Sequence, residues 1–226
     1  MSITDRNFSY FKQQASVYGR ETYWRFDEQA LVDRFFIKQH AKILVLGCGG
    51  GRTLLALHNH PRQFEISAID IVPEMVAEAS NRVHGTSIDV KCMDAASLEF
   101  PDQLFDYAFF PFHGIDYVTP HPEAAIAEAS RVLKPDGLFV FSSHNRLFIK
   151  KLAHVCKSHA DYEGVHTFRM WPWPSRYMKK YFHTVAVIAR ISLYPLSASN
   201  WKDKIYKVIP WLSKSLYFIA NKPKNI

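Results

Sequence analysis

The sequence predicts an α/β fold, a doubly wound and mostly parallel sheet with helices on both faces. Short apolar or β-branched runs alternate with segments of helical spacing that are mostly about 10 to 20 residues long. The first five runs are apolar nearly throughout, which indicates strands buried on both faces, and such strands are typical of parallel sheets. A glycine-rich segment follows the first run directly. Together these observations predict a βαβ architecture.

The first five predicted strands are the apolar runs at residues 41–47, 64–70, 87–93, 105–112 and 137–144. Predicted helices lie at residues 27–38, 52–58, 73–82, 122–133 and 175–181. Pro73 and Pro122 each begin a predicted helix, because the first helical turn does not need the N–H that proline lacks. Two later runs, at 184–194 and 213–224, are expected to form a hairpin-like pair at one side of the sheet, with a late antiparallel strand.

Composition is that of an ordinary globular protein. A chain of 226 residues with 48% hydrophobic and 15% aromatic content can bury a core, so we expect one domain. The start lacks a secretory signal pattern and no apolar run approaches the roughly 18 residues of a membrane span, so we expect a cytoplasmic protein. Cys48, Cys92 and Cys156 are too scattered for a disulfide framework or a metal site. We expect them to be small buried residues, and we expect no metal.

The net charge of +7 is unevenly distributed. Residues 131–226 contain 17 Lys and Arg against 4 Asp and Glu, whereas residues 1–130 contain 11 basic and 17 acidic residues. A basic C-terminal part is typical of proteins that bind nucleic acid, anionic lipid or a phosphorylated substrate. Scattered lysines on a solvated face are the simpler interpretation.

The segment ILVLGCGGGR, residues 43–52, ends the first strand with a glycine-rich turn. In a parallel sheet such a turn brings backbone N–H groups and a helix N-terminus close to a ligand. A dinucleotide motif Gly-x-Gly-x-x-Gly does not fit, because its third glycine falls on Arg52 or Leu54. A P-loop is excluded because no Gly-Lys-Ser/Thr follows. The spacing Gly-x-Gly-x-Gly from Gly47 to Gly51 favours a nucleoside without a pyrophosphate.

With these motifs the sequence resembles the class I S-adenosylmethionine-dependent methyltransferases of the quinone-biosynthesis-like type, most closely from about Tyr10 to about Asn145. ILVLGCGGG resembles the family's first motif, whose glycines pass under the methionine part of the cofactor. ISAIDIVPEMVAEA resembles the second, with Asp70 placed 19 residues after Gly51 to accept both ribose hydroxyls. CMDAASLEF places Asp94 where the family contacts the adenine amino group. ASRVLKPDGLFVFSS resembles the family's turn and fifth strand.

The resemblance implies S-adenosylmethionine as the cofactor and S-adenosylhomocysteine as its product. The residues that it implies as cofactor contacts are Tyr18, Gly47, Cys48, Gly49, Gly51, Asp70, Ile71, Met75, Met93, Asp94, Ala95 and Phe110. It also implies a single methyltransferase domain over residues 1–226. That domain would comprise an N-terminal helical cap (1–40), a cofactor-binding core (41–145), and an acceptor-side insertion with the terminal strands (146–226).

Several of these residues have simpler interpretations. Asp70 also suits a cap of the helix that begins at Pro73. Asp94 also suits a plain turn, and Met75 a core position. Family members often carry an acidic residue where Val45 stands, so any role of that carboxylate is missing here.

The segment FFPFHGIDYV, residues 109–118, follows the fourth strand and is expected to line the transfer site. It lacks the Asp/Asn-Pro-Pro-Tyr/Phe motif of adenine-amino methyltransferases, which argues against a nucleobase N-methylase of that kind. Methyl transfer needs little acid–base chemistry, because the sulfonium is already activated. If the acceptor is a hydroxyl or a protonated amine, the general-base candidates are His113, Asp116 and His144. A structural role for His113 is the alternative.

The acceptor is expected to meet aromatic residues from the N-terminal arm and from the insertion after the fifth strand. Trp171, Trp173 and Tyr177 lie beside arginines and lysines in HTFRMWPWPSRYMKKYF, a composition that suits stacking on an acceptor or packing within a lid. The sequence therefore predicts methyl transfer to a small-molecule or lipid-like acceptor. Two alternatives stay open, an RNA methyltransferase that uses the basic C-terminal part and a cofactor-binding regulator without turnover.

Overall fold

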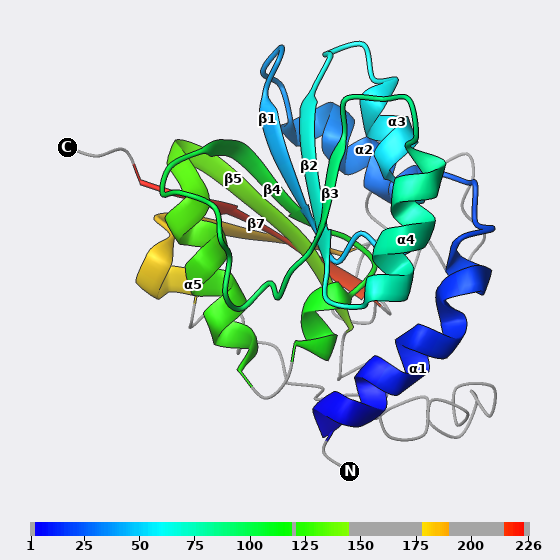
Figure 1. Cartoon of the computed structure of the whole chain (residues 1–226). Coiled ribbons are helices and arrows are strands. Elements are labelled where there is room, and N and C mark those ends of the chain that lie inside the picture. Colours follow the sequence, from blue (N-terminus) through cyan, green and yellow to red (C-terminus); the bar gives the residue numbers. More distant parts are fainter. Residues whose placement is uncertain (1–2, 119–120, 145–177, 190–214, 224–226) are drawn as a thin grey trace, which may run out of the picture.

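The computed structural model describes residues 3–118, 121–144, 178–189 and 215–223. The strands are β1 Lys42–Leu46, β2 Glu65–Asp70, β3 Asp89–Cys92, β4 Phe105–Phe110, β5 Leu133–His144, β6 Thr184–Ala189 and β7 Ser215–Asn221. The helices are α1 Ile3–Tyr18, α2 Phe26–Phe35, α3 Leu54–His58, α4 Pro73–Arg82, the 3-10 helix η1 Gly114–Tyr117 and α5 Pro122–Val132. The seven strands form one sheet in the order β3-β2-β1-β4-β5-β7-β6 (Figure 1).

The predicted fold class is confirmed. Strands β1 to β5 are parallel, β7 pairs antiparallel with β5, and β6 pairs antiparallel with β7. The late pair β6–β7 thus extends one side of the sheet, as the sequence predicts. Because the chain reverses its lateral direction at β1, the loops after β1 and β4 diverge at the carboxyl edge of the sheet, where α/β proteins bind ligands.

Helices cover both faces of the sheet, and side chains of β1 alternate between them (Figure 1). Ile43 and Val45 pack in a core with α2, α3 and α4. Leu44 and Leu46 pack in a second core with α5 and with Met178, which belongs to a helical turn at residues 178–181. Each β1 side chain named here is fully buried, which explains why this strand is apolar throughout.

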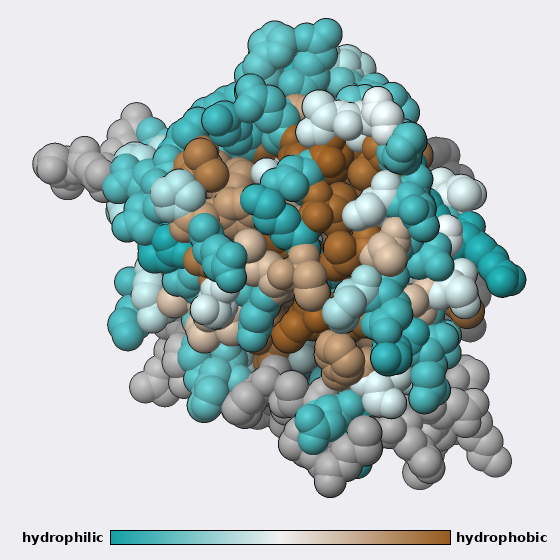
Figure 2. Space-filling view, in the orientation of Figure 1, coloured by the Kyte–Doolittle hydropathy of each residue, from teal (hydrophilic) through white to brown (hydrophobic). Residues whose placement is uncertain are grey.

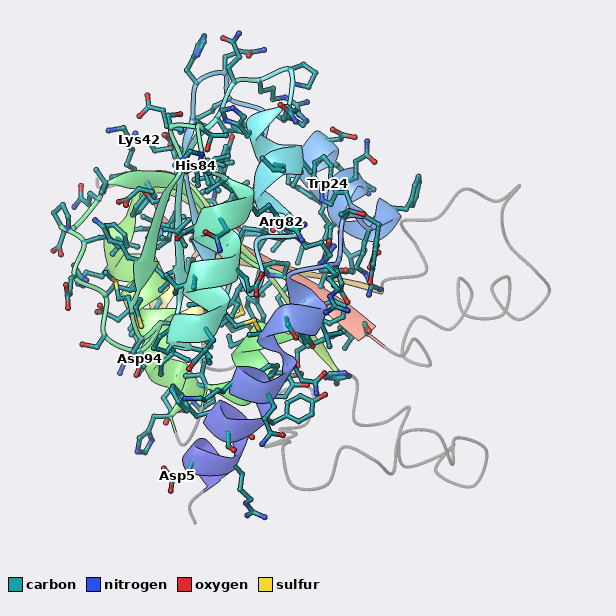
Figure 3. All side chains as sticks on the ribbon, turned by 45° about the vertical axis from the view of Figure 1, so that its right-hand side comes forward. Asp5, Trp24, Lys42, Arg82, His84 and Asp94 are labelled. Atoms are coloured by element: carbon teal, nitrogen blue, oxygen red, sulfur yellow. The ribbon has the colours of Figure 1, made fainter. Side chains whose placement is uncertain are left out.

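Helix α1 crosses the carboxyl edge of the sheet and packs against α4 (Figure 1). Lys12 of α1 forms an ion pair with Glu74 of α4 at 2.9 Å. Beyond α1, the carbonyls of Gly19 and Glu21 accept hydrogen bonds from Arg82, which is labelled at the end of α4 in Figure 3. Helix α1 and the segment after it are therefore held at the edge where the sequence predicts a ligand.

Four details differ from the sequence expectations. Helix α2 ends at Phe35 rather than at residue 38, where the Lys38 N–H donates to the Tyr107 hydroxyl at 2.9 Å. Helix α3 begins at Leu54 rather than at residue 52. Strand β5 begins at Leu133, ahead of the predicted 137, and bulges around Asp136, whose φ is +61°. Cys48 is buried as expected, but Cys92 is exposed because it ends an edge strand.

No helix within the described residues is both long and apolar enough to span a bilayer. Within the same residues, no group of three His, Cys, Asp or Glu side chains is arranged to hold a metal ion.

Candidate functional site

A cavity of about 410 Å³ lies at the carboxyl edge, between α1, the glycine loop, the ends of β2 and β3, and η1. Most of its walls are apolar or aromatic. Figure 2 shows a hydrophobic patch on the surface between α4 and α5, and hydrophilic surface surrounds this patch. Eleven of the twelve residues that the sequence predicts as cofactor contacts line the cavity: Tyr18, Gly47, Cys48, Gly49, Asp70, Ile71, Met75, Met93, Asp94, Ala95 and Phe110.

The Asp70 carboxylate joins β2 to the glycine loop. Its Oδ2 accepts a hydrogen bond from the Gly49 N–H at 2.8 Å, and its Oδ1 accepts one from the Val72 N–H at 3.0 Å. Burial raises the pKa of the Asp70 carboxyl, and these backbone hydrogen bonds partly oppose the rise. Asp70 therefore supports the start of α4 and also faces the cavity. A carboxylate offers about four lone-pair sites, so two accepted bonds leave capacity for a ligand diol.

The remaining glycines of the loop also pack closely on protein, and of these two only Gly50 lines the cavity. A Cβ at Gly50 would lie 2.5 Å from the backbone nitrogen of Gly19, just beyond α1. Gly51 has φ +78°, and a Cβ there would lie 3.0 Å from Ala79 of α4. Gly51 is the one predicted cofactor contact that does not line the cavity, because its backbone packs on this helix. Only part of the glycine-rich pattern thus serves the ligand side.

The end of β3 provides a polar group and an apolar floor. Asp94 is exposed, and its Oδ1 accepts a hydrogen bond from the Ala96 N–H at 2.8 Å, so it forms the turn that the sequence also suggests. Met93 and Ala95 on either side are buried. Ile71 is 47% exposed, and Met75 is buried under Val72 and Ala15. The side chains of Asp94 and Ile71 are thus open to a ligand, whereas Met75 is chiefly packing.

Helix α1 supplies one wall, as the expected aromatic N-terminal arm with Tyr18 indicates, although Phe8 and Asn7 were not predicted. Phe8, Phe11 and Tyr18 line the cavity, and Asn7 joins them. The Phe11 ring meets the Tyr117 ring of η1 edge to face, with centroids 4.9 Å apart. The spacing of these residues along the helix, with a polar Asn7 on the apolar side, is a signal that was available in the sequence.

Arg52, next to the glycine loop, is buried in an ion pair. Its guanidinium donates two bonds of 2.7 Å to the carboxylate of Glu28, whose side chain is fully buried in α2. The guanidinium carbons of Arg52 and Arg25 lie 5.4 and 5.1 Å from the centre of the Phe112 ring, which lines the cavity. Arg25 is paired with Asp27, which also accepts a hydrogen bond from Tyr217 of β7. Sequence reasoning did not identify this network.

The three general-base candidates form one cluster behind the cavity wall. The Asp116 carboxylate accepts hydrogen bonds from the Ser143 hydroxyl at 2.6 Å and from the His144 N–H at 2.9 Å, and lies 2.8 Å from His144 Nδ1. The His113 and His144 rings stack with centroids 3.9 Å apart, and His113 Nε2 lies 2.8 Å from Ser215 Oγ. Strands β5 and β7 and the loop after β4 converge at this cluster.

Segment 109–118 lines the cavity through Phe110, Pro111, Phe112, Gly114, Tyr117 and Val118. The general-base candidates His113, Asp116 and His144 do not line it, which corrects the expectation for these three residues. The loop after β4 turns at Phe112 and His113, both with positive φ, so that Phe112 faces the cavity and His113 faces β5 and β7. The predicted acceptor residues Trp171, Trp173 and Tyr177 lie outside the described residues.

Comparisons with known proteins agree with this geometry. Residues 43–137 match the family model of a methyltransferase domain. A phosphatidylethanolamine N-methyltransferase from Cereibacter sphaeroides is 32% identical over 127 residues, which cover 54% of this chain and 60% of that protein. A demethylmenaquinone methyltransferase from Thermus thermophilus is 31% identical over 128 residues, 54% of each protein. The chain thus spans little more than half the length of these curated relatives.

One solved structure shows the same fold over nearly the whole chain. It is the Haemonchus contortus phosphoethanolamine N-methyltransferase 2 in complex with S-adenosyl-L-methionine. The TM-score is 0.69 at 17% identity, and the match covers 99% of this chain and 60% of that one.

Proposed function

We propose that this chain is a class I S-adenosylmethionine-dependent methyltransferase, which binds S-adenosylmethionine in the cavity and transfers the methyl group to a small-molecule or lipid-like acceptor. The match of residues 43–137 to a methyltransferase-domain model and the similarity to two curated methyltransferases support this proposal. The observation that carries the proposal is the Asp70 carboxylate. It ends β2, faces the cavity, and is tied to Gly49 of a Gly-x-Gly-x-Gly loop. This pairing suits a ribose diol beside a glycine turn that has no pyrophosphate motif.

The residues that line the cavity fit the parts of such a cofactor. The loop from Gly47 to Gly49 would pass under the methionine part, and Asp70 would accept hydrogen bonds from the ribose hydroxyls. Asp94 would accept one from the adenine amino group, with Ile71 and Ala95 against the ring. Tyr18 and Phe110 would cover the cofactor from two sides. When bound, S-adenosylmethionine supplies a methyl group on a positively charged sulfur that is already activated for displacement.

The chain's own contribution is orientation and exclusion of water. Helix α1 and the aromatic residues Phe11, Phe112 and Tyr117 enclose the cavity, and a dry, well-oriented pocket provides most of the barrier reduction for an in-line transfer. We assign His113, Asp116 and His144 a positioning role in this proposal. They hold η1, and with it Tyr117, against the ends of β5 and β7.

The cavity walls favour an apolar acceptor over an anionic one. Among the described lining residues the only Arg or Lys is Arg52, whose guanidinium is already bound by Glu28. Asp70 and Asp94 add negative charge. The relatives named above, a phospholipid methyltransferase and a quinone-precursor methyltransferase, agree with a lipid-like acceptor. The predicted acceptor-side residues Trp171, Trp173 and Tyr177 are part of this proposal.

The test is a labelling experiment. The purified protein is incubated with methyl-labelled S-adenosylmethionine and, separately, with lipid, polar-metabolite and RNA extracts. We expect label in the lipid or metabolite fraction. The Asp70→Ala variant is the matched negative control, since it loses the ribose acceptor. Label only in RNA would instead support the alternative acceptor class. Cofactor binding without label in any fraction would support a regulator.

A further inference from the structure

Asn7 of α1 carries a buried polar atom that no neighbour satisfies. The residue is 5% exposed and lines the cavity. Its Oδ1 is buried and has no hydrogen-bond partner in the part of the chain that the structure describes. A buried amide carbonyl without a partner costs about 1–3 kcal/mol, and the large majority of buried polar side-chain atoms in folded proteins have a partner. Asn7 Oδ1 is one of six such atoms in the described residues, and it belongs to a residue that lines the cavity.

The orientation of the Asn7 amide is set by the other end of the group. Its Nδ2 donates to the backbone carbonyl oxygen of Tyr117 at 3.4 Å. A flipped amide would place Oδ1 against that carbonyl, and two acceptors repel each other. The NH2 group must therefore face η1, and Oδ1 must be the atom without a protein partner.

Asn7 also occupies a defined place along the cavity. Tyr18, at the other end of α1, lies against the glycine loop, since a Cβ at Gly49 would be 3.7 Å from its ring. Eleven residues of helix separate Tyr18 from Asn7, or roughly 16 Å at 1.5 Å per residue. Asn7 is therefore at the end of the cavity away from the glycine loop, beside Tyr117. It is carried by the helix that encloses the cavity, so Oδ1 and a ligand would be buried together.

We propose that Asn7 is a ligand-binding residue whose Oδ1 accepts a hydrogen bond from an N–H or O–H group of a molecule bound in the cavity. This inference rests on the proposed function. The reaction has two molecules that offer such a donor, the adenine amino group of the cofactor and the hydroxyl or amine of the acceptor. Both present the same chemistry to Oδ1, and a ligand without a donor at this point would leave the carbonyl buried and unpaired.

The experiment compares Asn7→Leu with Gln13→Leu, a matched change on the exposed side of the same helix. Thermal unfolding without ligand and calorimetry with S-adenosylhomocysteine are measured for both variants and the wild type. A second variant, Asn7→Ala, is measured in the same way in case leucine does not fit. Leu removes the unpaired carbonyl but also the long 3.4 Å hydrogen bond to the Tyr117 carbonyl, and these two effects oppose each other, so we expect Asn7→Leu to change the Tm of the free protein little. We also expect it to weaken ligand binding about tenfold, while Gln13→Leu changes neither.

Whether cofactor affinity or the KM for the acceptor changes shows which of the two molecules supplies the hydrogen-bond donor. If the cofactor supplies the donor, S-adenosylhomocysteine binds about tenfold more weakly to both Asn7 variants. An analogue of S-adenosylhomocysteine in which an oxo group replaces the adenine amino group is then also measured. The loss of affinity on going to this analogue should be larger for the wild type than for the variants. If the acceptor supplies the donor, cofactor affinity is unchanged and the apparent KM for the labelled fraction rises about tenfold.

Two results would overturn the inference. The first is an unchanged affinity and an unchanged KM in both Asn7 variants. The second is a lower Tm together with an equal loss of affinity for every ligand, which would show that Asn7 contributes only to packing. A wild-type protein that binds no S-adenosylhomocysteine would instead overturn the proposed function.

Discussion

At the scale of single residues, Asp70 combines two roles that the sequence presented as alternatives. Its Oδ1 supports the Val72 N–H at the start of α4, as a helix cap would, while Oδ2 holds the Gly49 N–H. The residue is nevertheless part of the cavity wall. A substitution at this position must therefore affect both folding and ligand binding, and the two effects can be measured separately.

Asp70→Asn keeps the shape of the side chain and removes its charge. We expect the affinity for S-adenosylhomocysteine to fall by about 1.5–3 kcal/mol, the range for hydrogen bonds to a charged group. Stability should fall by about 1–3 kcal/mol, because the amide NH2 leaves one backbone N–H without an acceptor. Calorimetry and urea unfolding measure the two. Wild-type affinity in the folded variant would show that Asp70 is only a structural cap.

The raised pKa of Asp70 predicts a pH dependence of binding. Burial shifts this pKa above its usual range, so the carboxylate takes up a proton at a higher pH in the folded protein than in the unfolded chain. As the pH falls through the raised pKa, the folded state becomes more stable relative to the unfolded chain. The protonated Asp70, however, no longer offers a carboxylate to accept hydrogen bonds from the ribose hydroxyls. We expect affinity for S-adenosylhomocysteine to fall between neutral pH and about pH 4, the ordinary aspartate value. A flat calorimetric profile over this range would contradict the assignment, and Asp70→Asn should remove the dependence.

At the scale of elements, a buried ion pair joins the glycine loop to α2. The Arg52 and Glu28 side chains are 9% and 0% exposed, and two bonds of 2.7 Å link them. Asp27 of the same helix reaches Tyr217 of β7. This network connects the ligand-facing loop to the antiparallel side of the sheet. Breaking it should therefore shift the position of the loop.

Glu28→Gln breaks the pair while conserving shape. Removing one partner of a buried pair costs about 3–5 kcal/mol, but Glu21 Oε2 lies 3.5 Å from Arg52 Nε and still compensates part of the charge. We expect the free energy of unfolding in urea to fall by about 3 kcal/mol, the lower end of that range. The control is Glu65→Gln, because Glu65 pairs with Lys42 at 3.7 Å on the surface and the change should cost less than about 1 kcal/mol. Equal effects of the two substitutions would mean that the buried pair adds nothing beyond a surface one.

Gly50→Ala tests the contact between the glycine loop and the end of α1. The new Cβ would meet the Gly19 nitrogen at 2.5 Å, so the segment after α1 must move away from the loop. We expect faster proteolysis within α1 and weaker binding of S-adenosylhomocysteine. Gly85→Ala is the control, because φ there is +83° but no atom lies within 4 Å of the added carbon. It should lower stability by about 1 kcal/mol and leave binding unchanged. Intact α1 and unchanged affinity in Gly50→Ala would show that the contact is not needed.

At the scale of the whole molecule, the sheet separates two hydrophobic cores, and the cavity lies where both end at the carboxyl edge. Helix α1 contributes to neither core. It forms a small third cluster through Ala15, Val72 and Met75. The apolar area that anchors α1 is thus small compared with that of the sheet, and a ligand under α1 would add a substantial part of its contacts.

Ligand binding should therefore stabilise the molecule unevenly. With S-adenosylhomocysteine at about 100 times its Kd, mass action adds about 2.7 kcal/mol to the free energy of unfolding. We expect hydrogen exchange to slow most in α1 and the glycine loop, and least in β6 and β7. Uniform protection across the chain would contradict the role of α1 as the helix that encloses the ligand.

Local sequence patterns predicted most of the fold. Apolar runs flanked by helical spacing predicted the first five strands, and Pro73 and Pro122 marked where α4 and α5 begin, because these signals depend on neighbouring residues along the chain. The same holds for the glycine loop and Asp70, whose spacing is a property of one βαβ unit. Predicted element ends were less accurate. The end of α2 depends on Tyr107, and the start of β5 depends on its pairing with β4 and β7.

By itself, then, the sequence determined the fold class, the order of elements and the ligand-facing loop. Only the tertiary structure decided that Asn7 reaches Tyr117, that Glu28 neutralises Arg52, and that His113 turns away from the cavity. The physical reason is the same in each case. These contacts join residues distant along the chain, and their geometry depends on how helices and loops settle on the sheet, which local spacing does not specify.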